Sequence, residues 1–282
     1  MSTIYRSAGG RQAVEQRYRD YLDQWQVPAQ RRQIRTSQGE TFVVACGFED
    51  APPVVLLHGG GTNSTIWLGD AARWSQTRRV YLVDVIGEPG LSAASRPPLK
   101  SDAYAAWLDD VLDGLGVERA AFVGASLGGW LALDYAIRRT HRVERLALRA
   151  PAGVGRQKYG VVVAALFLTL LGERGRRIAL QLALGPTTDL GAFIDYMLLV
   201  HKHNRPRRDK LPIFGDEQLQ ALTAPLYVIV GAKDRMLDSQ GTARRLNTFV
   251  PHAAVVVVPD AGHSLTEDGE AIHRFLTDGL EP

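Results

Sequence analysis

The sequence is short of cysteine, of net charge and of long apolar runs, and each shortage excludes a class of protein. Cys46 is the only cysteine among 282 residues, so no disulfide can form within the chain and a cysteine-based metal site is excluded. The longest apolar run, residues 161–171, is shorter than the roughly 18 residues that cross a bilayer. The 33 basic residues nearly balance the 30 acidic ones, which gives no indication of nucleic-acid binding. We therefore expect a soluble, cytoplasmic protein with no membrane span and no nucleic-acid partner.

Composition and the spacing of apolar residues predict an α/β fold. Hydrophobic residues make up 45% of the chain, enough to bury a sizeable core. From residue 53 onward, short continuous apolar runs alternate with longer helical patterns, which is typical of a parallel sheet with helices on both faces. The runs are VVLLHGGG, VYLVD, AAFVG, VERLALRA, LYVIVG and AVVVVP, and the helices are expected at 64–76, 102–115, 127–139, 239–249 and 268–280.

Two segments depart from this alternation. Residues 11–26 have apolar side chains at helical spacing, and two short strands are expected after them, at 32–36 and 41–46. Residues 152–222 interrupt the pattern with apolar helical pieces, and this segment is too long for a plain crossover between strands. The predicted organisation is an N-terminal helical extension over 1–30, a core over 31–151 and 223–282, and a helical cap, or lid, inserted at 152–222.

The motif GASLGG, residues 124–129, places Ser126 between an apolar run and a helical segment. A serine on a strand-to-helix turn has a strained backbone that needs very small neighbours, here Gly124 and Gly128. The start of the following helix directs amide donors toward developing negative charge. We interpret Ser126 as a candidate nucleophile; the alternative is a tight turn with no chemistry.

The motif HGGG, residues 58–61, follows the run VVLL. Glycines past the end of a strand let the backbone bend, so the amide of Gly60 can join that of Leu127 in binding an oxyanion. The alternatives are a phosphate-binding turn or a flexible connector, although the segment lacks the GK[ST] of a P-loop. His58 itself is interpreted as fixing the turn by hydrogen bonds.

Two further strand ends carry polar residues. Asp234 follows LYVIV in the motif GAKD, and His263 follows AVVVV in the motif GHS. In a parallel sheet both lie at the same edge as Ser126, so His263 can act as general base and Asp234 can orient it. Two rival acids lie nearby: Asp238 looks more like a helix cap, and Asp260 precedes the histidine by only three residues.

Several aromatic residues are weaker candidates for lining a substrate pocket. For each of them packing in the core, or between cap and core, explains an aromatic side chain equally well. The four are Trp67, Trp130, Phe167 and Tyr196.

His201 and His203 lie in the basic run HKHNRPRRDK, with no carboxylate or cysteine at ligand spacing, so a solvated basic face is favoured over a metal site. A turn is also the favoured interpretation of VDVIGEPGLS, residues 83–92.

The motifs HGGG, GASLGG, GAKD and GHS, in that order, resemble the α/β-hydrolase superfamily over about residues 40–282, and the capped esterase-like and carbon–carbon-bond-hydrolase-like members most closely. The resemblance implies an eight-stranded, mostly parallel sheet with helices on both faces, with Ser126, Asp234 and His263 as the triad. The chain departs from the superfamily in the loop GEPGLS and in Arg235-Met236 after the acid. Haloalkane dehalogenases have an aspartate at the elbow, so Ser126 argues against their chemistry.

The expected reaction is hydrolysis of a small, largely apolar carboxylic ester through an acyl-serine intermediate, without metal or organic cofactor. The same triad also serves thioesterases, lactonases, carbon–carbon bond hydrolases and acyltransferases. A hypothesis of another class is a slow-turnover binding module that signals through the cap. Self-association is open, with the N-terminal helix and the apolar cap as candidate contact surfaces.

Overall fold

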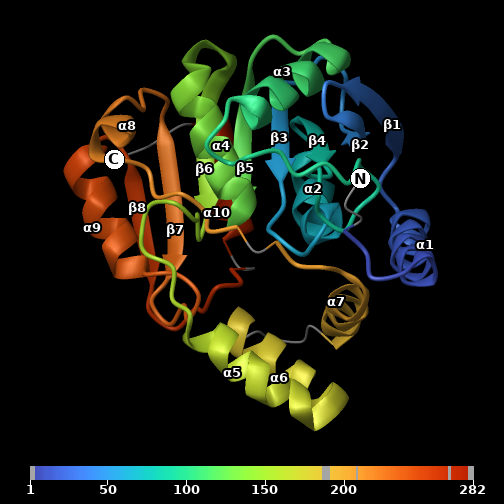
Figure 1. Ribbon diagram of the computed structural model, residues 1–282. Coiled ribbons are helices and arrows are strands. Elements are labelled where there is room, and N and C mark those ends of the chain that lie inside the picture. The colour runs from blue at the N-terminus through green and yellow to red at the C-terminus, as the bar shows by residue number, and fades with distance from the viewer. Residues whose placement is uncertain (1–3, 186–190, 208, 266–267, 279–282) are drawn as a thin grey trace.

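The computed structural model describes residues 4–185, 191–207, 209–265 and 268–278, and an eight-stranded sheet forms its centre (Figure 1). The sheet order is β1-β2-β4-β3-β5-β6-β7-β8, in which β2 pairs antiparallel with both β1 and β4 while every other neighbouring pair is parallel. This confirms the predicted α/β-hydrolase sheet. The strands are β1 (Ala29–Thr36), β2 (Gly39–Cys46), β3 (Pro53–Leu57), β4 (Arg79–Val83), β5 (Ala120–Ala125), β6 (Val143–Arg149), β7 (Leu226–Gly231) and β8 (Ala254–Val258).

The central strands are apolar at every position because the sheet is buried on both faces. Successive side chains of a strand point to opposite faces. In β3, Val55 and Leu57 belong to one hydrophobic cluster, whereas Val54 and Leu56 belong to another on the far side. All four are fully buried, which explains why the run VVLL shows no polar alternation.

Helices cover both faces of the sheet. Trp107 of α3, Leu131 of α4 and Leu246 of α9 pack in the first cluster, and Tyr18 of α1 and Trp74 of α2 pack in the second. The second cluster also includes residues of α10. The helices are α1 (Ala8–Gln24), α2 (Leu68–Trp74), preceded by a 3-10 turn at Ser64–Trp67, α3 (Ala103–Leu115), α4 (Leu127–Arg138), α9 (Ser239–Phe249) and α10 (Gly269–Asp278).

The segment between β6 and β7 is helical over its described residues, with the helices α5 (Gly160–Leu168), α6 (Gly172–Leu184), α7 (Gly191–His203) and the short α8 (Asp216–Gln220). Helices α7 and α8 contribute residues to the two clusters that pack on the sheet, whereas the described residues of α5 and α6 contribute none. Figure 1 shows α5 and α6 side by side, at the end of the molecule toward which β7 points. Helix α7 contacts α6 and also packs against the N-terminal helix α1, so the N-terminal extension and the inserted segment share an interface.

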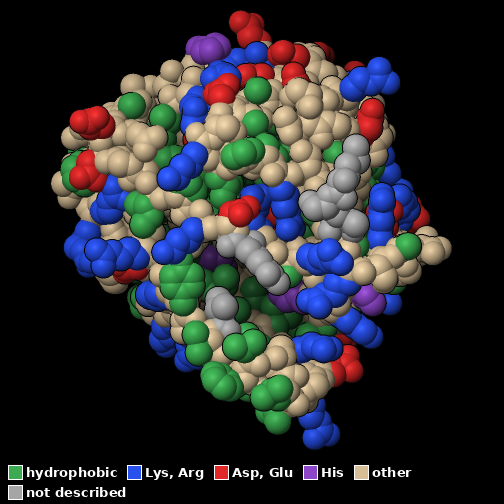
Figure 2. Space-filling model, viewed as in Figure 1, with side chains coloured by type: hydrophobic (Ala, Val, Ile, Leu, Met, Phe, Trp, Pro, Cys, Tyr) green, Lys and Arg blue, Asp and Glu red, His purple; other side chains and the backbone are tan. Residues whose placement is uncertain are grey.

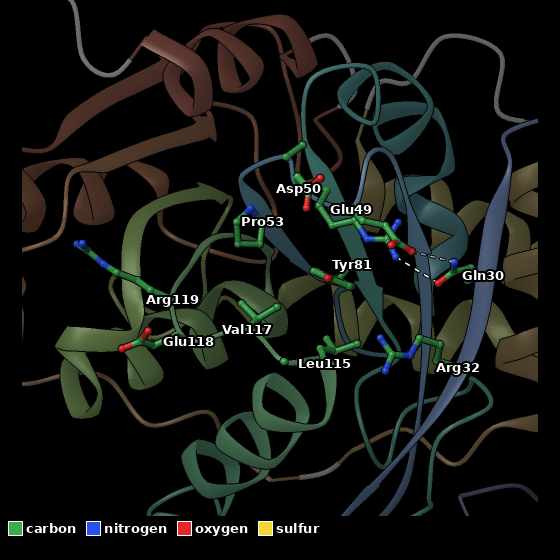
Figure 3. Close-up of a pocket in the computed structure, with 13 residues that line it drawn as sticks. Gln30, Arg32, Glu49, Asp50, Pro53, Tyr81, Leu115, Val117, Glu118 and Arg119 are labelled. Carbon is green, nitrogen blue, oxygen red and sulfur yellow. Dashed lines mark hydrogen bonds between the residues drawn. The ribbon is translucent and has the colours of Figure 1, made fainter.

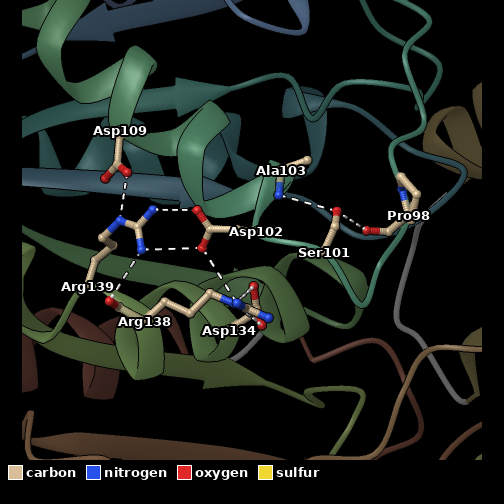
Figure 4. Close-up of polar contacts among 8 residues, drawn as sticks. All are labelled: Pro98, Ser101, Asp102, Ala103, Asp109, Asp134, Arg138 and Arg139. Carbon is tan, nitrogen blue, oxygen red and sulfur yellow. Dashed lines mark hydrogen bonds and ion pairs between the residues drawn. The ribbon is translucent and has the colours of Figure 1, made fainter.

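Ion pairs fasten α3 to α4 (Figure 4). Arg139 binds Asp102 and Asp109, each at 2.7 Å. The hydrogen bonds from Arg139 lower the pKa of Asp102. Within α4, Arg138 donates to the buried carboxylate of Asp134 at 2.9 Å.

In the part of the chain that the structure describes, no helix has both the length and the apolar character that crossing a membrane requires.

Candidate active site

Ser126 lies on the turn between β5 and α4 in a strained backbone conformation. Its φ of 51° and ψ of −109° lie outside the regions open to most L-residues, and such a residue costs about 1–3 kcal/mol. Backbone hydrogen bonds hold it there: its amide donates to the carbonyl of Arg149 at 3.0 Å, and its carbonyl accepts from the amides of Trp130 at 3.0 Å and Ala152 at 3.1 Å. The surrounding chain therefore fixes Ser126 at the carboxyl end of β5.

The two glycines that flank the serine are required by close approach of the backbone. A Cβ atom on Gly124 would lie 2.5 Å from the carbonyl oxygen of Gly128, and one on Gly128 would overlap the carbonyl oxygen of Leu57. Because these neighbours are backbone atoms, they cannot rotate away. The structure thus gives the physical reason for the small residues expected at positions 124 and 128.

Asp234 and His263 meet beyond the ends of β7 and β8. His263 Nδ1 donates to Asp234 Oδ2 at 2.7 Å. The other carboxylate oxygen accepts from the backbone amides of Met236 at 2.7 Å and Leu237 at 2.9 Å. Burial alone would raise the pKa of Asp234, but these hydrogen bonds, with His263 contributing most, lower it below its ordinary value. Asp234 is therefore ionised, and both of its carboxylate oxygens accept hydrogen bonds.

The two rival acids are engaged elsewhere. Asp238 caps α9 by accepting from the amide of Gly241 at 2.9 Å. Asp260 forms a 2.7 Å pair with Lys233 and is 88% exposed. Neither carboxylate contacts His263, which leaves Asp234 as the acid that pairs with it.

Ser126 and the Asp234–His263 pair share one edge of the sheet. Strands β5, β6, β7 and β8 are parallel neighbours in that order, so the residues that follow β5, β7 and β8 emerge at the same edge. Among the described residues, the Ser126 hydroxyl makes no hydrogen bond to His263. Such catalytic contacts are often long without substrate and shorten when it binds.

The glycine loop after β3 contacts the serine turn. A Cβ atom on Gly59 would lie 3.6 Å from Ser126 Cβ, and one on Gly60 would lie 3.5 Å from Leu127 Cδ2. Leu127 begins α4, and the first amides of a helix have no intrahelical acceptor. The loop and the helix start therefore bring the Gly60 and Leu127 segments together beside Ser126, where the sequence predicts an oxyanion site.

His58 is a structural residue of this loop. It is fully buried, its Nδ1 donates to the carbonyl of Gly59 at 2.9 Å, and its Nε2 accepts from the amide of Val85 at 2.9 Å. Burial lowers its pKa, so the ring is neutral and both nitrogens are occupied. This agrees with the turn-fixing role predicted for it.

The C-terminal end of α6 rests on the loop that carries His263. The amide of Ser264 donates to the carbonyl of Leu184 at 2.9 Å. A Cβ atom on Gly262 would lie 2.6 Å from the Cα of Gly185, so the two glycines pass in direct contact. The inserted segment thus contacts the chain on both sides of the candidate base.

The aromatic candidates fall into two groups. Trp67, Trp130 and Tyr196 expose at most 2% of their surface and pack in the core, the alternative that the sequence left open. Trp130 stacks on Phe214, and Tyr196 accepts a hydrogen bond from a side-chain amide. Phe167, on α5, is 66% exposed. Figure 2 shows a hollow between the core and the α5–α6 pair, with hydrophobic and histidine side chains at its margin.

The basic run HKHNRPRRDK, which begins in the last turn of α7, is less uniform than the sequence suggested. His203 lies against Gly10 of α1, whereas His201 lies over the glycine loop, 3.4 Å from where a Cβ of Gly61 would be. The side chain of His201 remains exposed to solvent there. The described residues include no cluster of three or more histidine, cysteine or carboxylate side chains arranged to hold a metal ion.

Sequence reasoning missed Glu88 as a residue of this region. It lies in GEPGLS, the loop in which the chain departs from its superfamily, and it is 1% exposed. One of its carboxylate oxygens accepts from the amide of Gly61 at 2.7 Å. The sequence feature that could have indicated Glu88 is that it is a charged residue among glycine, proline and apolar residues just beyond a strand.

A cavity of about 650 Å³ lies at the opposite edge of the sheet, where β3 and β4 begin (Figure 3). It is open and charged, with Arg32, Arg79 and Arg119 offset by three carboxylates. Arg79 binds the carbonyl of Gly47 and the side chain of Gln30. No member of the candidate triad lines it, so the size of this cavity does not mark it as the active site.

The sheet, the strained serine turn and the acid–histidine pair define the α/β-hydrolase class, and comparison with known proteins agrees. The alpha/beta hydrolase family model matches residues 54–275. Carboxylesterase YbfK of Bacillus subtilis is 29% identical over 279 residues, 94% of each chain. The crystal structure of carboxylesterase CesB (YbfK) matches with a TM-score of 0.85 at 28% identity and covers 97% of this chain and 100% of that one.

Two further relatives widen the comparison. The crystal structure of naproxen esterase from Bacillus subtilis has a TM-score of 0.80 at 31% identity and covers 92% of this chain and 95% of that one. The 2-hydroxymuconate semialdehyde hydrolase of Pseudomonas putida is 40% identical over 247 residues, 81% of this chain and 86% of that protein. The chain belongs to the alpha/beta hydrolase family, and its relatives support a hydrolase.

Proposed function

We propose that the chain is a serine carboxylesterase that hydrolyses a small, largely apolar ester through an acyl-Ser126 intermediate. The observation that carries the proposal is the 2.7 Å hydrogen bond between Asp234 and His263 at the sheet edge where Ser126 is held in a strained turn. The similarity to YbfK and to naproxen esterase supports ester hydrolysis over the other reactions open to such a triad.

Acylation follows from the arrangement of the imidazole. Because Nδ1 carries the proton that Asp234 accepts, Nε2 of the neutral ring is free to take the Ser126 hydroxyl proton as Oγ attacks the ester carbonyl. The amides of Gly60 and Leu127 stabilise the oxyanion that develops. When the tetrahedral intermediate collapses, the carbon–oxygen bond to the alcohol breaks and the leaving oxygen receives the proton from Nε2.

Deacylation repeats these steps with water in place of the serine. His263 takes a proton from water, the resulting hydroxide attacks the acyl carbon, and the proton returns to Ser126 Oγ as the acid leaves. Asp234, ionised because its pKa is lowered, stabilises the imidazolium in both halves of the cycle. No step draws on a metal or an organic cofactor.

The helices inserted after β6 serve as the cap in this proposal. The segment Gly160–Leu171 exposes large apolar side chains: Val163, Leu166, Phe167, Leu170 and Leu171 are 55–84% exposed. We assign Phe167 to the substrate side of this surface. An apolar cap beside a polar triad suits a substrate with one ester group on a hydrocarbon body.

The test is labelling and turnover by wild type and Ser126→Ala. A fluorophosphonate should modify wild type stoichiometrically and leave Ser126→Ala unlabelled, and a chain-length panel of aryl esters should be hydrolysed by wild type only. If the folded wild-type protein takes up no label, the serine mechanism is wrong. Label without turnover of any ester would favour the slow binding module or a specialised acyl acceptor.

Carbon–carbon bond hydrolysis is the second candidate, favoured by the 40% identity to the 2-hydroxymuconate semialdehyde hydrolase. It uses the same residues, so mutation of the triad does not distinguish it. Parallel assays do: a dienoate ketone substrate cleaved faster than every aryl ester, at equal concentration, would replace the esterase proposal.

A further inference from the structure

The glycine loop rests on a buried carboxylate from the next loop of the chain. Glu88 Oε2 accepts from the amide of Gly61 at 2.7 Å, and a Cβ atom on Gly60 would lie 3.9 Å from the same oxygen. The carboxylate therefore touches the loop at the peptide that follows Gly60. Gly61 has a φ of 69°, so this peptide is held in a turn and not in an extended strand.

Two arginines balance the charge of Glu88: Arg207, in the segment that follows α7, and Arg96, in the loop between β4 and α3. Its Oε1 makes no hydrogen bond within the described residues and lies 3.6 Å from Arg207 Nε and 3.9 Å from Arg96 Nη2. Arg207 is itself only 8% exposed and donates to the hydroxyl of Tyr104. Its Nη1 atom also pairs with the exposed carboxylate of Asp209 at 3.3 Å, so the largely buried guanidinium of this arginine lies between Glu88 and a carboxylate at the surface.

The location makes both halves of this pair relevant to the reaction. An acceptor for the Gly61 amide fixes the loop so that Gly60 can offer its own amide to an oxyanion, and small displacements of such donors are costly. An uncompensated carboxylate at this place would oppose the negative charge that develops on the substrate. Two guanidinium groups remove that opposition.

We propose that Glu88 is the positioning residue of the oxyanion loop, with Arg207 as the counterion that makes its buried charge compatible with catalysis. The inference rests on the esterase function proposed above. In this proposal the loop GEPGLS, in which the chain departs from its superfamily, supports the oxyanion site, and the segment that follows α7 affects the rate of the chemical step through Arg207.

Four variants test the proposal, with kcat and KM for an aryl ester and the Ki of an aryl boronic acid as readouts. Glu88→Ala should lower kcat by roughly 10- to 100-fold, leave KM within about twofold and weaken the boronate in proportion to kcat, because the loss concerns the tetrahedral state. Glu88→Gln keeps an acceptor for the Gly61 amide and should retain kcat within about threefold of wild type. Arg207→Met should lower kcat, and Glu88→Gln/Arg207→Met should recover most of the loss.

The matched control is Asp134→Asn, which also removes a buried carboxylate paired to an arginine, but on α4 away from the site (Figure 4). It should change thermal stability and leave kcat near that of wild type. Folded Glu88→Ala with unchanged kcat and boronate Ki overturns the inference, as does a double variant no faster than Arg207→Met. If wild type neither labels with fluorophosphonate nor turns over, the proposed function fails and the inference with it, whereas an active wild type confines failure to Glu88.

Discussion

Replacing Asp234 with asparagine changes one atom and tests how the acid fixes the imidazole. In wild type, Oδ1 accepts from the amides of Met236 and Leu237 while Oδ2 accepts from His263. An asparagine that keeps its oxygen toward the two amides presents its NH₂ group to His263. The Nδ1 atom must then accept, which moves the ring proton to Nε2, the atom that takes the Ser126 proton in the proposed mechanism.

The opposite orientation of the asparagine is worse. It would direct an NH₂ group at two backbone amides and leave both donors unpaired, at about 1–3 kcal/mol for the buried amide of Leu237 and less for the partly buried amide of Met236. We therefore expect the inactive tautomer to dominate. Loss of the charge and of the correct tautomer should lower kcat by about 10⁴-fold, or roughly 5 kcal/mol of transition-state stabilisation, while KM changes little.

The assay is steady-state hydrolysis of an aryl ester together with the second-order rate of fluorophosphonate labelling, both on folded protein. Asp238→Asn and Asp260→Asn are the controls, since both acids are near in sequence but bind elsewhere. Each control should keep kcat within a few fold of wild type. The reasoning is refuted if Asp234→Asn stays within tenfold of wild type, or if either control loses as much activity.

Three further predictions concern the fold around the site. Gly128→Ala should lower the free energy of unfolding by about 1–3 kcal/mol or more through overlap with the backbone. Gly69→Ala, in a helix where an added Cβ meets nothing within 4 Å, should leave it unchanged or raise it, and urea unfolding measures both. Burial lowers the pKa of His58 below its ordinary value of 6.5. As the pH falls through 6.5, the unfolded chain therefore binds a proton at His58 while the folded chain does not. Stability should therefore fall with decreasing pH, and His58→Asn should flatten that slope between about pH 7.5 and 5.5; an unchanged slope would contradict the assignment. Arg149 lies buried between two carboxylates at 2.5 and 2.9 Å, so Arg149→Met should cost about 3–5 kcal/mol in the same measurement, and a loss under 1 kcal/mol would show that the charges are not coupled.

The parts of the fold that local pattern specifies were predictable. Continuous apolar runs located the strands of the sheet, and the polar residue just beyond each run located Ser126, Asp234 and His263. The strand predictions succeed because a strand buried on both faces must be apolar throughout. Parallel strands bring their carboxyl ends to one edge, which is why the three polar residues lie at the same edge, and their catalytic roles stay predictions. The order of four motifs along the chain carried more information than any one of them.

Contacts between distant segments were not predictable. From the sequence, Trp67 and Trp130 could equally line a pocket or pack in the core, and only the residues packed around them in the structure place both in the core. Nothing local to Glu88 indicates that its partners are Gly61 and Arg207, which are 27 and 119 positions away. The sequence analysis gave no bounds for helix α6 within the expected helical insertion, and its sequence, GERGRRIALQLAL, begins with glycine and charge rather than with an apolar run.

The contact of α6 with the His263 loop has a consequence for anyone who redesigns the entrance to the site. Leu184 and Gly185 contact Ser264 and Gly262, so a graft that replaces the whole insertion would disturb the loop of the proposed base, His263, together with the apolar surface of the insertion. The chain that leads into α5 is tied to the acid instead: Lys158 donates its amide to the carbonyl of Met236 at 2.7 Å and its ammonium group to the carbonyl of Asp234 at 2.8 Å. If the proposed function holds, a library that varies the exposed residues of α5 and preserves both Lys158 and the end of α6 should alter substrate preference while the Asp234–His263 pair keeps its geometry.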